Sequence, residues 1–288
     1  MPWREIRLET LADVQSRMHL IASEGDWAHR GQASAEWKDL RPSLARALAP
    51  GLSQGDRLNI ERQATQTFLQ LARHHLDAAD SALLGHPLQR NVIMQHFRAP
   101  TRLLDWTASP WVALYFAVSS FPDQDGTVWS FRTTDLRIRT MQDQQQVEVG
   151  LQNGRAERLL EMFYNEVPMP IVWLLDPWTR NSRLAAQQAL FTVASDVGGD
   201  HAQLLADFYP TESNDVLCRF VIPKELKRQT VLMLAAMNIS PATLFPGLDG
   251  LGASIADLVT HQIRSPGLIG RVFLQRQDGS TLSCVPLA

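Results

Sequence analysis

The order of helical and strand patterns along this 288-residue chain constrains its fold more than any other feature. Apolar residues recur at helical spacing in some segments, while others are rich in β-branched and aromatic residues bounded by turn signals. The two kinds of segment do not alternate regularly, as they would in a doubly wound parallel sheet. We therefore predict an α+β fold with a mixed sheet core and several helices.

The same patterns give approximate bounds for the elements. Helices are predicted over residues 11–24, 56–76, 87–97, 110–119 and 223–237. Strands are predicted over residues 27–32, 127–131, 170–175 and 216–222, with a hairpin over 271–285. We expect an N-terminal helix within residues 1–24, one domain over 25–260, and a C-terminal β-hairpin within 261–288 that packs on it. Residues 142–164 fit either an insert or lid, or a solvated helix pair.

The charge of the chain bears on its partners. The formal net charge is -3 and the isoelectric point about 6.2, so no long-range attraction for a polyanion is expected. Yet only three of the 27 basic residues are lysines, namely Lys38, Lys224 and Lys227. This bias has two interpretations, genome composition or the use of planar guanidinium groups to recognise phosphate and carboxylate.

Cysteine, histidine and hydropathy patterns exclude several kinds of site. Cys218 and Cys284 form no CxxC pair, and the N-terminus is charged from Arg4 onward, so we expect a reducing, cytoplasmic setting. No apolar run approaches the roughly 20 residues of a membrane span. His74 and His75 are adjacent and would diverge by about 100° on a helix, which is poor spacing for a metal. We predict no metal site and no membrane association.

The segment over residues 95–110 is polar but lies between two predicted helices. Arg102 and Asp105 are three residues apart, and Leu103 and Leu104 between them favour burial. We therefore expect Asp105 to be partly buried against an arginine. Such a pair is seldom selected for stability, because desolvation can exceed the Coulombic gain. It indicates either a functional site or a structural ion pair that positions a loop.

Several blocks of the chain belong to one recognisable pattern. They are Arg30-Gly31-Gln32, residues 40–46, Pro100-Thr101-Arg102-Leu103-Leu104-Asp105-Trp106-Thr107, residues 111–117, residues 181–192 and residues 243–251. This set resembles the FRG domain family of bacteria and phages over about residues 25–260. His29, Arg98 and Ala189 depart from the family pattern, which more often has an aromatic residue, glycine and glycine at those positions.

Two of these blocks are also similar, more faintly, to those of ADP-ribosyltransferases. That resemblance implies a first strand ending at Arg30-Gly31, a middle block over residues 101–115, and a final motif position at Gln187. It also implies an ADP-ribosyltransferase-like fold and NAD as substrate. The glutamate usual in the last motif has no clear counterpart. Candidates for it, which also fit a solvated helix face, are Glu148, Glu157, Glu161 and Glu166.

The resemblance assigns roles to individual residues. Arg30 would pair with phosphate, Gln187 with a ribose hydroxyl, and Asp105 would stabilise positive charge or accept a proton from the acceptor. Trp106 or Tyr115 would stack on the nicotinamide ring. The expected catalytic residues are thus Arg30, Asp105 and Gln187. The expected cofactor-binding residues are Arg30, Gly31, Gln32, Thr101, Arg102, Trp106 and Tyr115.

Two functions follow from the sequence. The first is an NAD-dependent ADP-ribosyltransferase-like enzyme, a toxin or phage-defence effector with an antitoxin or defence-system partner. Its acceptor is left open between protein, nucleic acid and small molecule. The second is a non-catalytic module that binds nucleic acid or protein. An enzyme should bring Arg30, Arg102, Asp105 and Gln187 into one concave pocket, whereas a nucleic-acid binder should spread its arginines along a groove.

Overall fold

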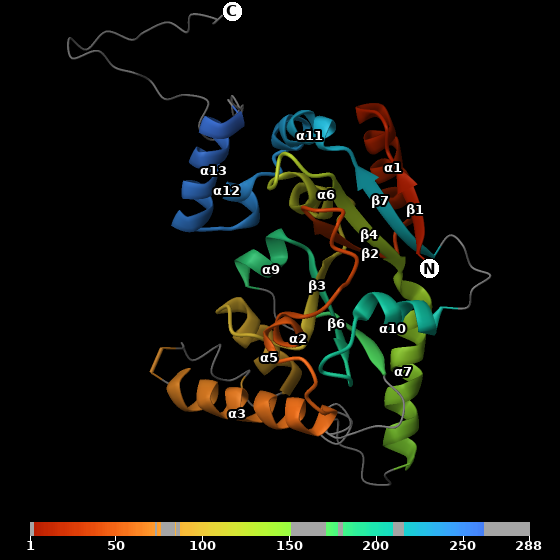
Figure 1. Cartoon of the computed structure of the whole chain (residues 1–288), viewed down its shortest axis with the longest axis vertical. Helices are drawn as coiled ribbons and strands as arrows, with labels where there is room; N and C mark the ends of the chain where they lie inside the picture. The colour runs from red at the N-terminus through yellow and green to blue at the C-terminus, as the bar shows by residue number, and fades with distance from the viewer. Residues whose placement is uncertain are drawn as a thin grey trace, which may run out of the picture.

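The computed structural model describes residues 3–72, 74–75, 84, 87–150, 171–177, 181–209 and 216–261. Within these residues, seven strands form one sheet in the order β1-β7-β4-β2-β3-β6-β5 (Figure 1). The strands are β1 (Arg4–Arg7), β2 (Trp27–Gln32), β3 (Leu103–Thr107), β4 (Gly126–Arg132), β5 (Val172–Leu175), β6 (Ala189–Ala194) and β7 (Leu217–Ile222). β1 is parallel to β7, and the other neighbours are antiparallel. The mixed sheet confirms the predicted α+β class.

Helices surround this sheet, and local sequence explains where two of them begin. The helices are α1 (Leu11–Glu24), α2 (Ser43–Ala47), α3 (Gln54–Ala72), α5 (Pro87–His96), α6 (Pro110–Val118), α7 (Thr133–Gly150), α9 (Ser182–Ala186), α10 (His201–Phe208), α11 (Lys224–Ala236), α12 (Pro241–Leu244) and α13 (Leu248–His261). Thr10 and Asp13 form a capping box that starts α1. The Ser109 side chain caps α6, whose first residue is Pro110.

Apolar side chains cover both faces of the sheet. On one face, α1, α6 and α11 pack on β4 and β7 around residues such as Met18, Leu114 and Phe220. On the other face, α7 and α10 pack on Trp129 and Phe131 of β4. A smaller cluster joins α5 to β3, β5 and β6. The first face therefore has α6 over its middle strands and α5 over the strands beyond them.

Helix α6 lies unusually close to the sheet because two strands have glycine beneath it. A Cβ atom built on Gly31 would lie 1.9 Å from the backbone oxygen of Ala113, and one on Gly126 would lie 2.1 Å from that of Ala117. Ala113 and Ala117 are fully buried on the facing side of α6. Small residues on both elements thus let the helix backbone rest on β2 and β4.

The observed elements differ from the sequence prediction in particular places. Helix α1 and strand β2 have the predicted bounds, whereas β1, β3 and β6 were not predicted. The polar segment around Asp105 is not simply a link between two helices, since it contains β3. Helix α7 extends to Gly150. Residues 151–170 and the predicted C-terminal hairpin lie outside the described residues.

Candidate functional site

The sheet is weakly joined between β2 and β3. Strand β2 pairs with β4 along its whole length, but its registered pairing with β3 is limited to His29 opposite Thr107. Arg30 follows this pair, and its Nη1 donates a hydrogen bond of 2.7 Å to the backbone oxygen of Asp105. The guanidinium therefore occupies the position of a strand partner where the two backbones separate.

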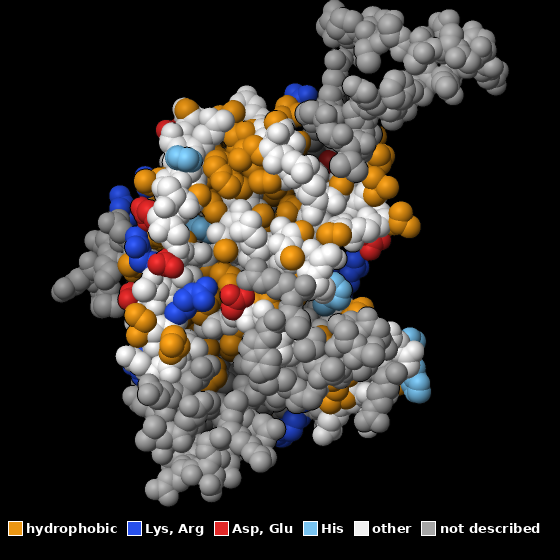
Figure 2. Space-filling model, turned by 180° about the vertical axis from the view of Figure 1, so that it is seen from behind, with side chains coloured by type: hydrophobic (Ala, Val, Ile, Leu, Met, Phe, Trp, Pro, Cys, Tyr) orange, Lys and Arg blue, Asp and Glu red, His pale blue; other side chains and the backbone are white. Residues whose placement is uncertain are grey.

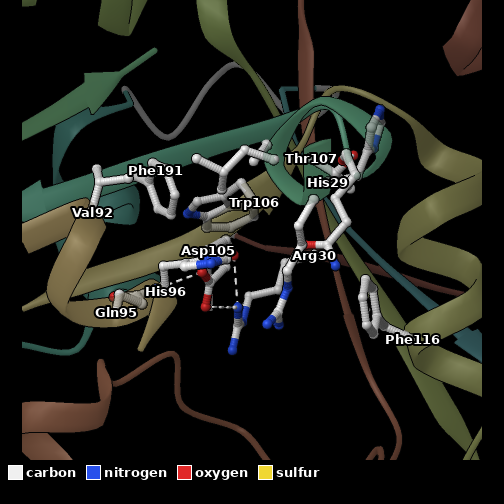
Figure 3. Close-up of a pocket in the computed structure, with 15 residues that line it drawn as sticks. His29, Arg30, Val92, Gln95, His96, Asp105, Trp106, Thr107, Phe116 and Phe191 are labelled. Carbon is white, nitrogen blue, oxygen red and sulfur yellow. Dashed lines mark hydrogen bonds and ion pairs between the residues drawn. The ribbon is translucent and has the colours of Figure 1, made fainter. Parts of the chain in front are cut away.

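A cavity of about 310 Å³ opens beside this separation (Figure 3). Residues of β2, β3, β6, α5, α6 and α9 line it. The volume lies near the lower end of the range for small-molecule sites, roughly 300 to 1,000 Å³. Its polar lining includes Arg30, Gln95, Asp105, Arg183 and Gln187. The predicted residues Arg30, Asp105 and Gln187 are thus brought together.

Asp105 presents its carboxylate to this cavity. Gln95 Nε2 donates to its Oδ1 at 2.5 Å, and Arg30 Nη1 lies 3.7 Å from its Oδ2 (Figure 3). The Asp105 side chain is 61% exposed, so the expectation that it would be partly buried is wrong. It alternates with Leu104 and Trp106, which point into the core on the other face of β3. The carboxylate is accessible to a ligand.

Arg30 is more enclosed than its partner. Its side chain is 21% exposed, and its Nε is buried without a hydrogen-bond partner. Burial lowers the pKa of Arg30, Asp105 partly restores it, and the positive charge of Arg46 lowers it further. The guanidinium thus keeps hydrogen-bonding capacity in a partly desolvated place, where interactions with an anion are stronger than in water.

Gln187 reaches the cavity from the end of α9. Asn181 caps the start of this short helix, and Gln187 follows its last residue. Gln187 Nε2 donates to the backbone oxygen of Leu244 at 3.0 Å, and Thr107 Oγ1 donates to the backbone oxygen of Gln187 at 2.6 Å. These bonds fix the segment against β3 and α12. Among the described residues, we find no donor to its side-chain oxygen.

Aromatic rings form the walls of the cavity. Phe116 of α6 and Phe191 of β6 line it, as does Trp106 of β3, whose indole points into the core on the other face of the sheet. Trp106 Nε1 donates to Thr192 Oγ1 at 2.9 Å, which fixes the orientation of the indole. Phe116 and Phe191 were not among the predicted site residues. Phe116 lies in the helix predicted over residues 110–119, and Phe191 lies on an unpredicted strand.

Two buried histidines lie around the site. His29 Nδ1 is 2.8 Å from Ser130 Oγ, and His201 Nδ1 is 2.7 Å from Thr192 Oγ1. Burial lowers the pKa of each imidazole to about 3, with a further contribution from Arg30 at His201. Both rings are therefore neutral in the folded protein near pH 7.

These two histidines predict acid sensitivity. The ordinary pKa of histidine is about 6.5, so below that pH the unfolded chain binds a proton at each of the two rings. The folded protein binds these protons only near pH 3. Their contribution to stability is present above pH 6.5 and is lost as the pH falls. Between pH 6 and pH 5 we expect a loss of about 2 kcal/mol, measurable by urea unfolding.

Substitutions separate this effect from other titrations. His201→Asn should remove about half of the loss. Exposed His19, replaced by asparagine, is the matched control. A free energy of unfolding that does not change between pH 6 and pH 5 would contradict the assignment.

The comparison with known families addresses the region that builds this site. The FRG domain family model matches residues 25–126, from the turn before β2 to the first residue of β4. The chain carries an FRG domain. No curated protein and no solved structure matches the chain. Of the cavity residues, Arg30, Gln95, Asp105 and Phe116 belong to the matched part, and Arg183, Gln187 and Phe191 lie beyond it.

Arg102 of the FRG domain lies in the core and does not line the cavity. It is 1% exposed, and its Nε donates to Glu61 Oε1 at 2.6 Å, while Nη2 contacts the other carboxylate oxygen. Its Nη1 also donates to the backbone oxygen of Ala194 at 3.3 Å. The expected pairing with Asp105 is wrong, because α3 supplies a buried carboxylate from 41 residues upstream. Arg102 therefore joins α3 to the sheet.

Three further predicted residues lie away from the cavity lining. Tyr115 is buried in α6, and its hydroxyl is 3.5 Å from Asp257. Gln32 accepts a bond from Trp129 Nε1 at 2.6 Å, and Thr101 donates its N–H to Ser43 Oγ at 3.0 Å. These contacts hold the framework of the FRG domain, with Thr101 also bonded to the cavity residue Gln95.

Gly31, one of the expected cofactor-binding residues, lines the cavity. Its missing Cβ makes room for the backbone of α6, which also carries Phe116.

The structure does not test the glutamate candidates for the last motif. Glu157, Glu161 and Glu166 lie outside the described residues, as does the side chain of Glu148. In the described part of the chain we find no group of three or more His, Cys, Asp or Glu side chains arranged for a metal. Across the same residues, no helix has both the length and the apolar character needed to cross a membrane.

Proposed function

We propose that the cavity binds NAD and that this FRG domain protein acts as an ADP-ribosyltransferase-like enzyme. One observation carries the proposal: Arg30, Asp105 and Gln187 come from three separate segments and line a single cavity with aromatic walls. A guanidinium suits a phosphate, and an aromatic wall suits the nicotinamide ring. The exposed carboxylate suits a ribose that develops positive charge.

The reaction follows from these groups. The bond between ribose C1′ and the nicotinamide nitrogen breaks, and its electron pair leaves with nicotinamide. The Asp105 carboxylate stabilises the resulting oxocarbenium-like ribose. A nucleophilic acceptor then forms a bond to C1′, and its proton passes to Asp105 or to water. Gln187 orients the ribose by a hydrogen bond from a hydroxyl to its side-chain oxygen.

The arrangement of charge favours this enzyme over a nucleic-acid-binding module. A binder of long nucleic acids would need basic side chains along an extended surface. On the face shown in Figure 2, the larger groups of lysine and arginine side chains of the described residues lie beside acidic residues and do not form one continuous basic strip. We further propose that the functional domain extends to about residue 260, and that NAD consumption serves a toxin or defence role in the cytoplasm.

The proposal predicts that Asp105→Asn leaves the protein folded but inactive. Because the carboxylate is 61% exposed, the melting temperature should change little. NAD consumption should fall by about 100-fold or more, since the amide neither stabilises the cation nor accepts a proton. Arg30→Lys should also lose most activity, because an ammonium cannot grip phosphate in a bidentate manner. The measurement is release of nicotinamide in cell extract, which supplies acceptors.

Exposed Asp123, replaced by asparagine, is the matched control and should retain full activity. If wild-type protein neither binds NAD in calorimetry nor consumes it in extract, the proposal fails. The non-catalytic binding module would then be the better description.

A further inference from the structure

A second cavity of about 160 Å³ lies next to the first. The two share Arg30, Gln95 and Asp105 in their linings. The second adds the guanidinium-bearing residues Arg46 and Arg98, so three arginines line it with a single carboxylate, that of Asp105. Arg46 and Arg98 are exposed to solvent, and a bound anion would further reduce the repulsion among the three guanidinium groups.

The positive charge of this cavity is only partly compensated by the protein. Arg46 Nη1 donates to the backbone oxygen of Arg41, a neutral acceptor. Within the described part of the chain, neither Arg46 nor Arg98 forms an ion pair. The positive charge of Arg46 lowers the pKa of Arg30. The buried Nε of Arg30 has no hydrogen-bond partner. The cluster therefore retains both charge and donors for a ligand.

The backbone at Arg98 supplies an independent observation. Arg98 has φ of 65°, and it follows α5 at the turn where Ala99 N donates to Met94 O at 2.8 Å. This left-handed position at a helix end is usually glycine. A residue with a Cβ is disfavoured in this conformation. The fold nevertheless has arginine here, and its side chain lines the second cavity.

We propose that the second cavity is an anion subsite, which binds the pyrophosphate of a nucleotide whose ring lies in the first cavity. Arginine donates two parallel hydrogen bonds to phosphate oxygens, and the net positive charge of the three arginines and Asp105 suits the negative charge of a nucleotide pyrophosphate. The identity of the nucleotide as NAD rests on the proposed function. Binding of pyrophosphate by the arginines does not rest on the proposed function, because it requires no bond to be broken.

The test uses inorganic pyrophosphate and NAD as separate probes in calorimetry on the full chain. Arg46→Gln and Arg98→Gly should each weaken pyrophosphate binding at least tenfold, and NAD binding by a similar factor. Arg98→Gly should melt at or above the wild-type temperature, because glycine suits the backbone there, so weaker binding would not reflect unfolding. Exposed Arg228 on α11, replaced by glutamine, is the control and should bind as the wild type does.

The outcomes separate the two proposals. If both variants bind pyrophosphate as the wild type does, or if the wild type binds none, the subsite is overturned, whatever the NAD assay gives. Arginine-dependent pyrophosphate binding without NAD consumption supports the subsite and contradicts the proposed reaction. A single-stranded oligonucleotide that displaces pyrophosphate with far higher affinity, and with steep salt dependence, would overturn the nucleotide assignment in favour of nucleic acid.

Discussion

Replacement of Arg102 by alanine is expected to lower the free energy of unfolding by about 3–5 kcal/mol. The change leaves the carboxylate of Glu61 buried without its partner, since the two side chains are 1% and 4% exposed. For a chain of this size, each kcal/mol corresponds to roughly 2–4 °C in melting temperature. Thermal unfolding of the two proteins measures the effect.

Two comparisons show whether the buried pair is the cause. The double substitution Arg102→Met with Glu61→Leu should recover most of the loss, because it removes both charges and refills the space. The Arg41–Asp39 pair is about half exposed on each side, and Arg41→Ala should cost less than about 1 kcal/mol. If Arg102→Ala and Arg41→Ala cost the same, the core role of Arg102 is wrong.

Replacement of Gly31 by alanine is expected to destabilise the protein by about 1–3 kcal/mol or more. The added Cβ would lie 1.9 Å from the backbone oxygen of Ala113 and 2.7 Å from the backbone nitrogen of Ala117, so α6 must move. Backbone atoms cannot yield as the end of a flexible side chain can. Phe116 moves with α6, so ligand affinity should fall together with the melting temperature.

Gly252 in α13 provides a matched substitution for this effect. A Cβ there meets nothing within 4 Å, so Gly252→Ala should be neutral or stabilise the helix by up to about 1 kcal/mol. A Gly31→Ala protein that melts like the wild type would show that α6 tolerates a methyl group beneath it.

Part of the fold could be predicted because its signals are local. The apolar spacing of α1 and the composition of β2 depend on neighbours in the sequence, and both bounds were predicted. Strand β3 was missed because it contains the charged residue Asp105 and lies between Pro100 and Pro110, a pattern that resembles a loop. Its alternation is nevertheless regular, with Leu104 and Trp106 facing one core while Asp105 points to the cavity.

The candidate site was only partly predictable, because local signals identify motif residues but not their distant partners. Arg30, Asp105 and Gln187 could be named from motif resemblance, but the partner of Arg102 could not. Glu61 lies on α3, 41 residues before Arg102, and no local pattern distinguishes it from an exposed glutamate. The second cavity, which three arginines line, was not predicted either. It depends on α2 and the turn after α5 meeting beside β3.

The single registered residue pair between β2 and β3 has a mechanical consequence. The sheet comprises two blocks of strands, β1-β7-β4-β2 and β3-β6-β5, with little backbone cohesion across their boundary. Arg30 belongs to one block and Asp105 to the other. A molecule that contacts both residues therefore links the two blocks of strands. Part of its binding energy opposes their separation.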